Sequence, residues 1–184
     1  HLAVLSMGGP ISAAFVDQFP ERVKSHILID PAGAAPIPTP GVARLVRLPF
    51  LGELILGLVG SANMVKSVAS DFYSPELVAH FQAKYSLQMK YKGYMRAILS
   101  TLRNGMLDSF SEIYRRVGKL KKPTLLFWGR NDATVPFEQS ALLTKAIPHA
   151  EFHIIENCGH IPHYEKPEEV NPALSEFVIR NSEL

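Results

Sequence analysis

The sequence alternates short apolar runs with helical patterns, and this alternation restricts the chain to one class of fold. Residues 1–5 and 24–30 are nearly continuous apolar runs, as expected for strands that are buried on both faces. Residues 10–16 between them carry apolar side chains at helical spacing. A strand, a helix and a second strand form a βαβ unit, whose strands pair in parallel. Two further apolar runs, 123–129 and 151–156, continue the pattern, so we predict an α/β fold with a parallel sheet and flanking helices.

The pattern is interrupted between the second and the third apolar run. Residues 35–117 contain no strand-like run, and four helical segments take its place: 51–58, 75–87, 91–103 and 108–117. Helical patterns also accompany the strands that follow, at 137–147 and 167–180. We therefore predict a core formed by residues 1–34 and 118–184, with residues 35–117 inserted as an all-helical cap.

Composition excludes several classes of protein. The 184 residues are 47% apolar and 20% charged with a net charge of +2, which is typical of a globular chain and leaves no basic surface for nucleic acid. A single cysteine cannot form a disulfide framework or a four-cysteine zinc site. The most apolar stretch, residues 46–65, is broken by Arg47, Pro49 and Glu53, so we predict no integral membrane segment. The chain starts at His1 instead of methionine, and its residues do not define the compartment, although the cytoplasm is favoured.

A serine follows the first strand at a tight turn. Ser6, Met7, Gly8 and Gly9 separate the apolar run from the helical segment, an arrangement typical of a nucleophile elbow. Such a turn exposes the serine oxygen to substrate, and the amide of Met7 is placed to stabilise a developing oxyanion. The two glycines leave room where the helix starts against the strand. The same residues also fit a serine N-cap on a loosened first helical turn, an interpretation without catalysis.

Polar side chains also follow the carboxyl ends of the other strands. Asp30 follows the second strand, Asp132 the third and His160 the fourth. Because the carboxyl ends of parallel strands meet at one edge of a sheet, we expect all three to lie there with Ser6. Either aspartate could serve as the partner of His160. Asp132 is preferred because its strand directly precedes the histidine strand, and Asp30 is kept as the alternative acid.

Four segments carry a resemblance to the α/β-hydrolase superfamily. They are residues 5–9, 29–33, 126–136 and 159–167, and the chain order serine, aspartate, histidine is the order of the family's catalytic triad. The chain resembles the C-terminal part of a capped serine hydrolase, from the nucleophile-elbow strand onward. The resemblance implies Ser6 as the nucleophile, Asp132 as the acid and His160 as the base, beneath a helical cap and with no cofactor or metal.

The resemblance also implies a reaction. We expect a serine hydrolase of the esterase or lipase type, which cleaves a small-to-medium apolar carboxylic ester through an acyl-enzyme. The alternative is hydrolysis of a carbon–carbon bond in a ring-cleavage product, which relatives perform with the same triad.

The chain departs from the family's pattern in two ways. Val4 stands two positions before Ser6, where a small residue is usual, and its branched side chain should crowd the helix at the elbow. The first four core strands are absent, together with the loop that supplies a second oxyanion donor. We therefore expect that a missing N-terminal segment or a partner chain is needed, and a non-catalytic fragment is the third interpretation.

Overall fold

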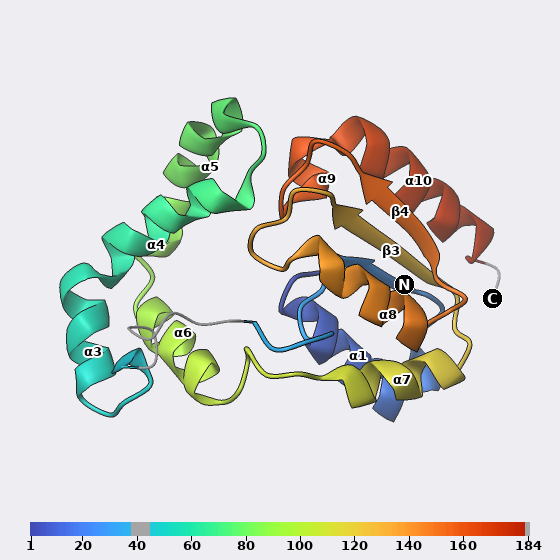
Figure 1. The fold of residues 1–184 in the computed structure, drawn as a ribbon, viewed down its shortest axis with the longest axis horizontal. Coiled ribbons are helices and arrows are strands. Elements are labelled where there is room, and N and C mark those ends of the chain that lie inside the picture. Colours follow the sequence, from blue (N-terminus) through green and yellow to red (C-terminus); the bar gives the residue numbers. More distant parts are fainter. Residues whose placement is uncertain (38–44, 183–184) are drawn as a thin grey trace.

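The computed structural model describes residues 1–37 and 45–182, and its centre is a four-stranded parallel sheet (Figure 1). The strands lie side by side in chain order as β1 (Leu2–Leu5), β2 (His26–Ile29), β3 (Thr124–Gly129) and β4 (Glu151–Ile155). Every neighbouring pair is parallel. The α/β fold with a parallel sheet, as the sequence predicts, is therefore confirmed.

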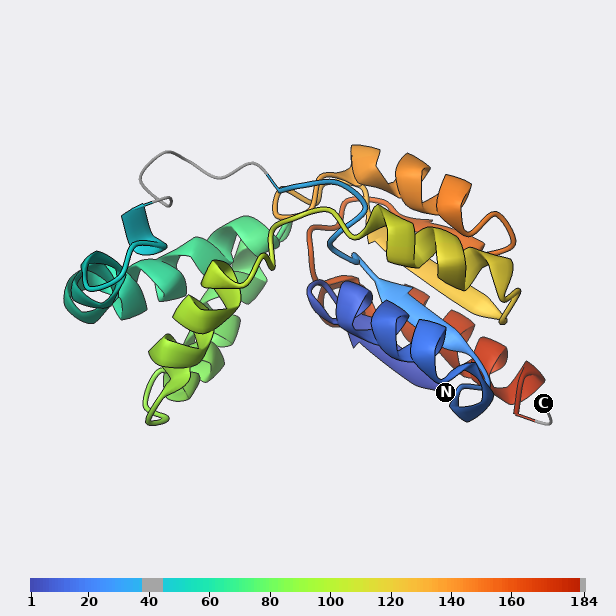
Figure 2. The ribbon, with the colours of Figure 1, turned by 90° about the horizontal axis from the view of Figure 1, so that it is seen from below.

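Helices cover both faces of this sheet. One face carries α1 (Gly8–Gln18), α7 (Ser111–Lys119) and α8 (Ser140–Ala146), and the other carries α10 (Pro167–Arg180), as Figures 1 and 2 show. Three short helices lie in the connections: η1 (Pro20–Arg22), η4 (Phe137–Gln139) and α9 (Pro162–Glu165). The central strands β2 and β3 are buried along their whole length because both of their faces are covered.

The apolar side chains of the central strands alternate between two cores. Leu126 and Trp128 pack in a core with residues of α1, α7 and α8. Leu125 and Phe127 point to the opposite face and pack in a second core with Val170 and other residues of α10. This alternation follows from the two-residue period of a strand. It holds β3 rigidly between two helix layers, so the loop after β3 starts from a fixed position.

The connection between β2 and β3 is helical in its described part. In chain order it contains α3 (Leu51–Ile55), the π-helix η2 (Leu56–Gly60), α4 (Ser61–Ser67), the 3-10 helix η3 (Val68–Asp71), α5 (Pro75–Gln88) and α6 (Tyr94–Arg103). These helices stand beside the sheet, on the side of its carboxyl ends (Figure 1). Residues 38–44 of the predicted insertion lie outside the described residues. Within the described part of the chain, no helix has both the length and the apolar character needed to cross a bilayer.

The predicted limit of the insertion, residue 117, falls inside a helix that packs on the sheet. Tyr114 and Val117 of α7 are buried in the same core as Ala13 of α1. The hydroxyl group of Tyr114 donates a hydrogen bond to the carbonyl of Ala32 at 2.7 Å. Helix α7 therefore packs against the sheet and belongs to the core, not to the inserted helices. The sequence could not show this, because an amphipathic helix has the same pattern whichever partner covers its apolar face. The division into a core and a cap stays a prediction.

Candidate active site

The turn between β1 and α1 holds Ser6 in a strained backbone conformation. Its φ angle is 52°, in the left-handed region that residues other than glycine seldom adopt. Three backbone hydrogen bonds fix the turn. The Ser6 N–H donates to the carbonyl of Ile29 at 3.0 Å, and the Ser6 carbonyl accepts from the N–H groups of Gly9 at 2.9 Å and Ala32 at 3.0 Å. Backbone strain that is held in this way is concentrated at functional sites in proteins.

The two glycines after Met7 allow the helix to start directly against its neighbours. A Cβ atom on Gly8 would lie 2.9 Å from the Cβ of Val4, and one on Gly9 would lie 2.4 Å from the hydroxyl of Tyr114. The crowding expected from Val4 is thus accommodated by the missing side chain of Gly8. Met7 is the N-cap residue of α1. The amide of Met7, the predicted oxyanion donor, therefore lies beside Ser6 at the positive end of a helix.

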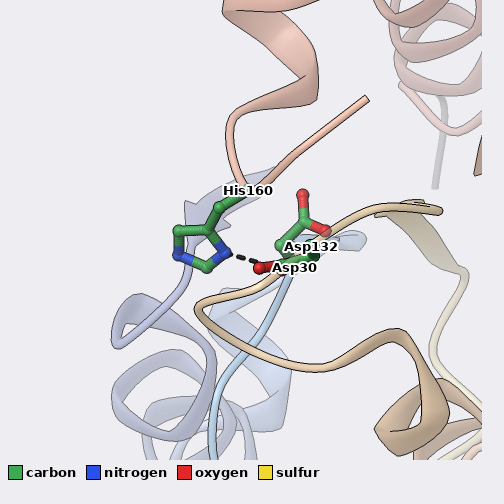
Figure 3. Close-up of side chains that lie close together, drawn as sticks. All are labelled: Asp30, Asp132 and His160. Atoms are coloured by element: carbon green, nitrogen blue, oxygen red, sulfur yellow. Dashed lines mark hydrogen bonds and ion pairs between the residues drawn. The ribbon is translucent and has the colours of Figure 1, made fainter. Parts of the chain in front are cut away.

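Asp132 and His160 form a buried hydrogen-bonded pair at the carboxyl edge of the sheet. The Oδ2 atom of Asp132 lies 2.7 Å from Nδ1 of His160 (Figure 3). The other carboxylate oxygen, Oδ1, accepts the backbone N–H groups of Thr134 and Val135, each at 2.8 Å. An ionised carboxylate only accepts hydrogen bonds, so Nδ1 of His160 carries the proton. Its Nε2 atom is then left as an acceptor, which is the tautomer that a general base needs.

Ser6 reaches the same edge of the sheet as this pair. The strands are all parallel, and Ser6 follows the carboxyl end of β1. The structure brings Asp132 and His160 into contact, whereas the hydrogen bonds of the described residues include none between Ser6 and His160. In unliganded sites the bond between nucleophile and base is often long, and it tightens when substrate binds. The assignment of Ser6 as nucleophile therefore stays a prediction.

Asp30, the alternative acid, lies in the site but does not bond to the histidine ring. Its side chain is fully buried, and its Oδ1 atom accepts the backbone N–H of Gly129 at 2.8 Å. Burial, together with the negative charge of Asp132, raises the pKa of Asp30 well above its ordinary value. Asp132 is thus the aspartate in contact with Nδ1 of His160, and Asp30 lies next to this pair (Figure 3).

Glu165 lies in the site, although no motif in the sequence indicates a role for it. Its buried carboxylate accepts the backbone N–H of Gly159 at 2.6 Å through Oε1. Through Oε2 it accepts the backbone N–H groups of Tyr73 and Ser74, at 2.7 and 2.8 Å. Glu165 therefore joins the loop that carries His160 to the inserted helices. The signal that could have revealed it is its position in the segment 159–167, five residues after the histidine.

Asp71 forms a second connection between the insertion and the site. Its carbonyl accepts the backbone N–H of His160 at 2.7 Å, and its Oδ1 atom accepts a short hydrogen bond from the hydroxyl of Thr134. Burial is the main cause that raises the pKa of the Asp71 carboxyl group. No local pattern marks Asp71 in the sequence, because its partners lie far away along the chain.

Cys158 and His163 lie close to His160 along the chain. Burial raises the pKa of the Cys158 thiol, so the thiolate is disfavoured. His163 lies on α9, and burial lowers the pKa of its imidazole. Among the described residues, Asp30, Asp132 and His160 also form a group compact enough to hold a metal ion, with one donor atom of each within 4.8 Å of the others. Hydrogen bonds already occupy both oxygens of Asp132 and the facing ring nitrogen.

Comparison with known proteins agrees with this geometry. The profile of the family described as alpha/beta hydrolase fold matches residues 1–167. The chain belongs to the α/β-hydrolase family. The chain order of Ser6, Asp132 and His160 is the order of the catalytic triad in this fold, and their catalytic roles stay a prediction.

Three similar proteins describe where in this family the chain lies. A 2-hydroxy-6-oxononadienedioate/2-hydroxy-6-oxononatrienedioate hydrolase from Paraburkholderia phymatum is 29% identical over 183 residues, which are 97% of this chain and 62% of that protein. A 2-hydroxy-6-oxo-6-phenylhexa-2,4-dienoate hydrolase from Comamonas testosteroni is 28% identical, with the same coverage. The solved structure of the latter type of hydrolase from a Rhodococcus strain superposes with a TM-score of 0.73 at 25% identity, over 96% of this chain and 63% of that one. The chain therefore spans less than two thirds of the length of each.

Proposed function

We propose that the protein is a hydrolase that cleaves a carbon–carbon bond in a 2-hydroxy-6-oxo-dienoate. The similarity over 97% of the chain to hydrolases that are named for such substrates supports this class of reaction. The observation that carries the catalytic assignment is the buried hydrogen bond of 2.7 Å between Asp132 and His160. It lies at the edge of the sheet that Ser6 also reaches, and no other described histidine contacts a buried aspartate in this way.

The roles of the residues follow from their chemistry. A serine hydroxyl is a weak nucleophile at neutral pH, so Nε2 of His160 accepts its proton as Ser6 attacks the substrate carbonyl. Asp132 keeps the ring in the correct tautomer and stabilises the imidazolium that forms, while it stays ionised itself. The oxyanion of the tetrahedral intermediate is stabilised by the amide of Met7. Water then releases the acyl group, with His160 again as the base.

Cleavage of a carbon–carbon bond adds one requirement to this scheme. The substrate is a ketone, so the bond that breaks joins the carbonyl carbon to the conjugated chain instead of to an ester oxygen. Hydrolysis adds hydroxide to the carbonyl carbon and a proton to the neighbouring carbon, which gives a carboxylic acid and a 2-hydroxydienoate. The carbon next to the ketone belongs to a double bond, so the 2-hydroxyl group first tautomerises to a ketone, which moves a proton to that carbon. The electron pair of the broken bond is then delocalised onto the new ketone oxygen, and this oxygen receives the proton that His160 took from Ser6.

The sequence favours an apolar ester as substrate, whereas the relatives favour the carbon–carbon alternative. In both reactions Ser6 attacks a carbonyl group, so the triad alone does not distinguish them. The two relatives support the distinction, because one is named as a hydrolase of a 2-hydroxy-6-oxo dienedioate or trienedioate and the other as a hydrolase of a 2-hydroxy-6-oxo dienoate. The reaction class therefore rests on the relatives, and the catalytic residues rest on the geometry of the site.

The test measures both reactions on the same protein. Loss of the conjugated absorbance of 2-hydroxy-6-oxo-6-phenylhexa-2,4-dienoate reports carbon–carbon cleavage, and release of p-nitrophenolate from p-nitrophenyl butyrate reports ester hydrolysis. We expect a higher kcat/KM for the dienoate, and loss of both activities in Ser6→Ala. Ser86→Ala changes a partly exposed serine of α5 and is the matched control. If the chain is part of a longer protein, the longer protein is assayed as well.

The outcomes separate the three interpretations. A higher kcat/KM for the ester than for the dienoate would indicate that the protein is an esterase and would contradict the proposal. Turnover that persists in Ser6→Ala would remove Ser6 from the mechanism. If neither substrate turns over and a fluorophosphonate probe does not label Ser6, the non-catalytic interpretation replaces the proposal.

A further inference from the structure

The carboxyl group of Asp30 is only half satisfied. It has no solvent exposure, and its Oδ1 atom accepts the N–H of Gly129 at 2.8 Å. The Oδ2 atom is also buried and has no donor among the described residues. An ionised oxygen that is taken out of water without a donor is strongly destabilised. A protonated oxygen at the same place needs an acceptor instead.

That acceptor is present. One carboxyl oxygen of Asp30, one of Asp132 and one ring nitrogen of His160 all lie within 4.8 Å of one another, and a side-chain interaction with Asp132 is among the causes that raise the pKa of Asp30. Two carboxylates at this distance in a buried site do not both ionise, and they share one proton. A contact between their oxygens becomes a hydrogen bond as soon as one of them carries that proton.

The proton belongs to Asp30 because the two groups have different partners. Asp132 accepts three hydrogen bonds, from the N–H groups of Thr134 and Val135 and from the ring of His160, and all three stabilise its charge. Asp30 accepts one, from the N–H of Gly129. Asp132 is therefore the better site for the negative charge.

The other groups that face Asp30 favour the same assignment. Beyond Asp132 and His160, they are Glu165 on α9 and the thiol of Cys158 in the loop after β4. Glu165 brings further negative charge, and the thiol brings none in its neutral form. Burial and the charge of Asp132 raise the pKa of Asp30, while the amide of Gly129 is the one group among these causes that lowers it.

We propose that Asp30 is a neutral carboxylic acid that donates its Oδ2 proton to the carboxylate of Asp132. Asp132 then accepts four hydrogen bonds in place of three, and its carboxylate is held in one orientation against His160. Asp30 is a positioning residue, since it acts on the histidine only through Asp132. The kinetic consequence rests on the proposed function, whereas the location of the proton does not.

The first test reads the proton directly. The protein is labelled with carbon-13 at the aspartate carboxyl carbons, and Asp30→Asn identifies the Asp30 signal by its loss. At pH 7 we expect this signal at the position of a protonated acid, whereas the signals of exposed aspartates lie at the ionised position. An ionised Asp30 signal at pH 7 would overturn the proposal. So would a shift of this signal on addition of Zn²⁺ or Mg²⁺, because it would make the group a metal site.

The second test reads the effect on the site. Asparagine can accept from Gly129 and donate to Asp132, so Asp30→Asn is expected to keep kcat/KM within about threefold of wild type. Asp30→Ala cannot donate, and we expect a loss of about tenfold, as for one hydrogen bond. Without the hydrogen bond donated by Asp30, the carboxylate of Asp132 keeps more of its negative charge and stabilises the imidazolium of His160 more strongly. The acid limb of the profile of kcat/KM against pH therefore moves to higher pH in Asp30→Ala and stays in place in Asp30→Asn.

The outcomes of the two tests are separable. A lower kcat/KM in Asp30→Ala with no movement of the acid limb would indicate a merely structural residue and would overturn the positioning role. Equal losses in both variants would overturn it as well. If the protein turns over neither the dienoate nor the ester, the proposed function fails, and the carbon-13 signal still decides where the proton lies.

Discussion

His26 provides a test of burial that does not depend on catalysis. It is the first residue of β2 and has no solvent exposure. The hydroxyl of Ser12 donates to the carbonyl of Gly9 at 2.9 Å, so Nε2 of His26, at 2.7 Å, must donate to that hydroxyl. Nδ1 is buried without a partner among the described residues. Protonation there would create an unpaired buried charge, and burial accordingly lowers the pKa of His26 from 6.5 to about 4.

The stability cost follows from this difference in pKa. The unfolded chain binds a proton on His26 as the pH falls through 6.5, whereas the folded protein resists protonation until about pH 4. The unfolded state therefore binds more protons in this interval, and the free energy of unfolding decreases as the pH falls. The decrease from His26 amounts to about 2 kcal/mol at pH 5 and about 3 kcal/mol at pH 4. Asp30, whose pKa is raised, contributes in the opposite direction, so the effect of His26 has to be isolated with a variant.

The assay is urea unfolding between pH 7.5 and pH 4, followed by the fluorescence of Trp128, the single tryptophan, which is fully buried. His26→Gln keeps a donor for Ser12 and does not titrate. We expect its stability to fall less than that of wild type on acidification, by the amounts given above. His149→Gln changes an exposed histidine and should follow the wild-type curve. If the curves of wild type and His26→Gln are parallel down to pH 4, His26 is not a buried neutral imidazole.

Three further substitutions test the site and its support. Asp132→Asn places an amide N–H against the histidine ring, and we expect kcat to fall by about 10⁴-fold in steady-state assays; a loss below tenfold would argue against Asp132 as the acid. Glu165→Gln replaces one carboxylate oxygen with an NH₂ group, which cannot accept from the backbone N–H groups that it faces. Urea unfolding should show a decrease of about 1–3 kcal/mol in the free energy of unfolding. Gly9→Ala places a Cβ 2.4 Å from the hydroxyl of Tyr114, which should cost about 1–3 kcal/mol by overpacking. Gly57→Ala, with nothing within 4 Å of the added atom, is its control; equal stability of the two would contradict the close approach at the elbow.

The parts of the site that the sequence predicts are those that strand order dictates. Asp132 and His160 each follow a buried apolar run, and parallel pairing brings the ends of neighbouring strands together. Their contact at 2.7 Å is a consequence of that rule. The preference for Asp132 over Asp30 as the partner of the histidine follows in the same way, because β3 and not β2 adjoins β4.

The parts that the sequence misses depend on contacts between distant segments. Asp71 contacts Thr134 and His160 from a 3-10 helix of the insertion, and nothing in its neighbourhood of the chain specifies that meeting. The same holds for α7, because Tyr114 is buried by a sheet that its own helical pattern does not identify. The proton on Asp30 is of this kind as well, since it depends on the charge of a residue from another strand.

The helical segment between β2 and β3 determines the order in which the protein assembles. Asp30 and Gly129, which close the middle of the sheet, are 99 positions apart, whereas Asp132 and His160 are separated by 28. Closing the longer loop costs about 1 kcal/mol more in chain entropy, before any contact across it compensates. We therefore expect the β1–β2 and β3–β4 pairs to form early as separate local units and the seam between β2 and β3 to join last. Substitutions at that seam would then mainly accelerate unfolding, whereas substitutions within either pair would slow folding.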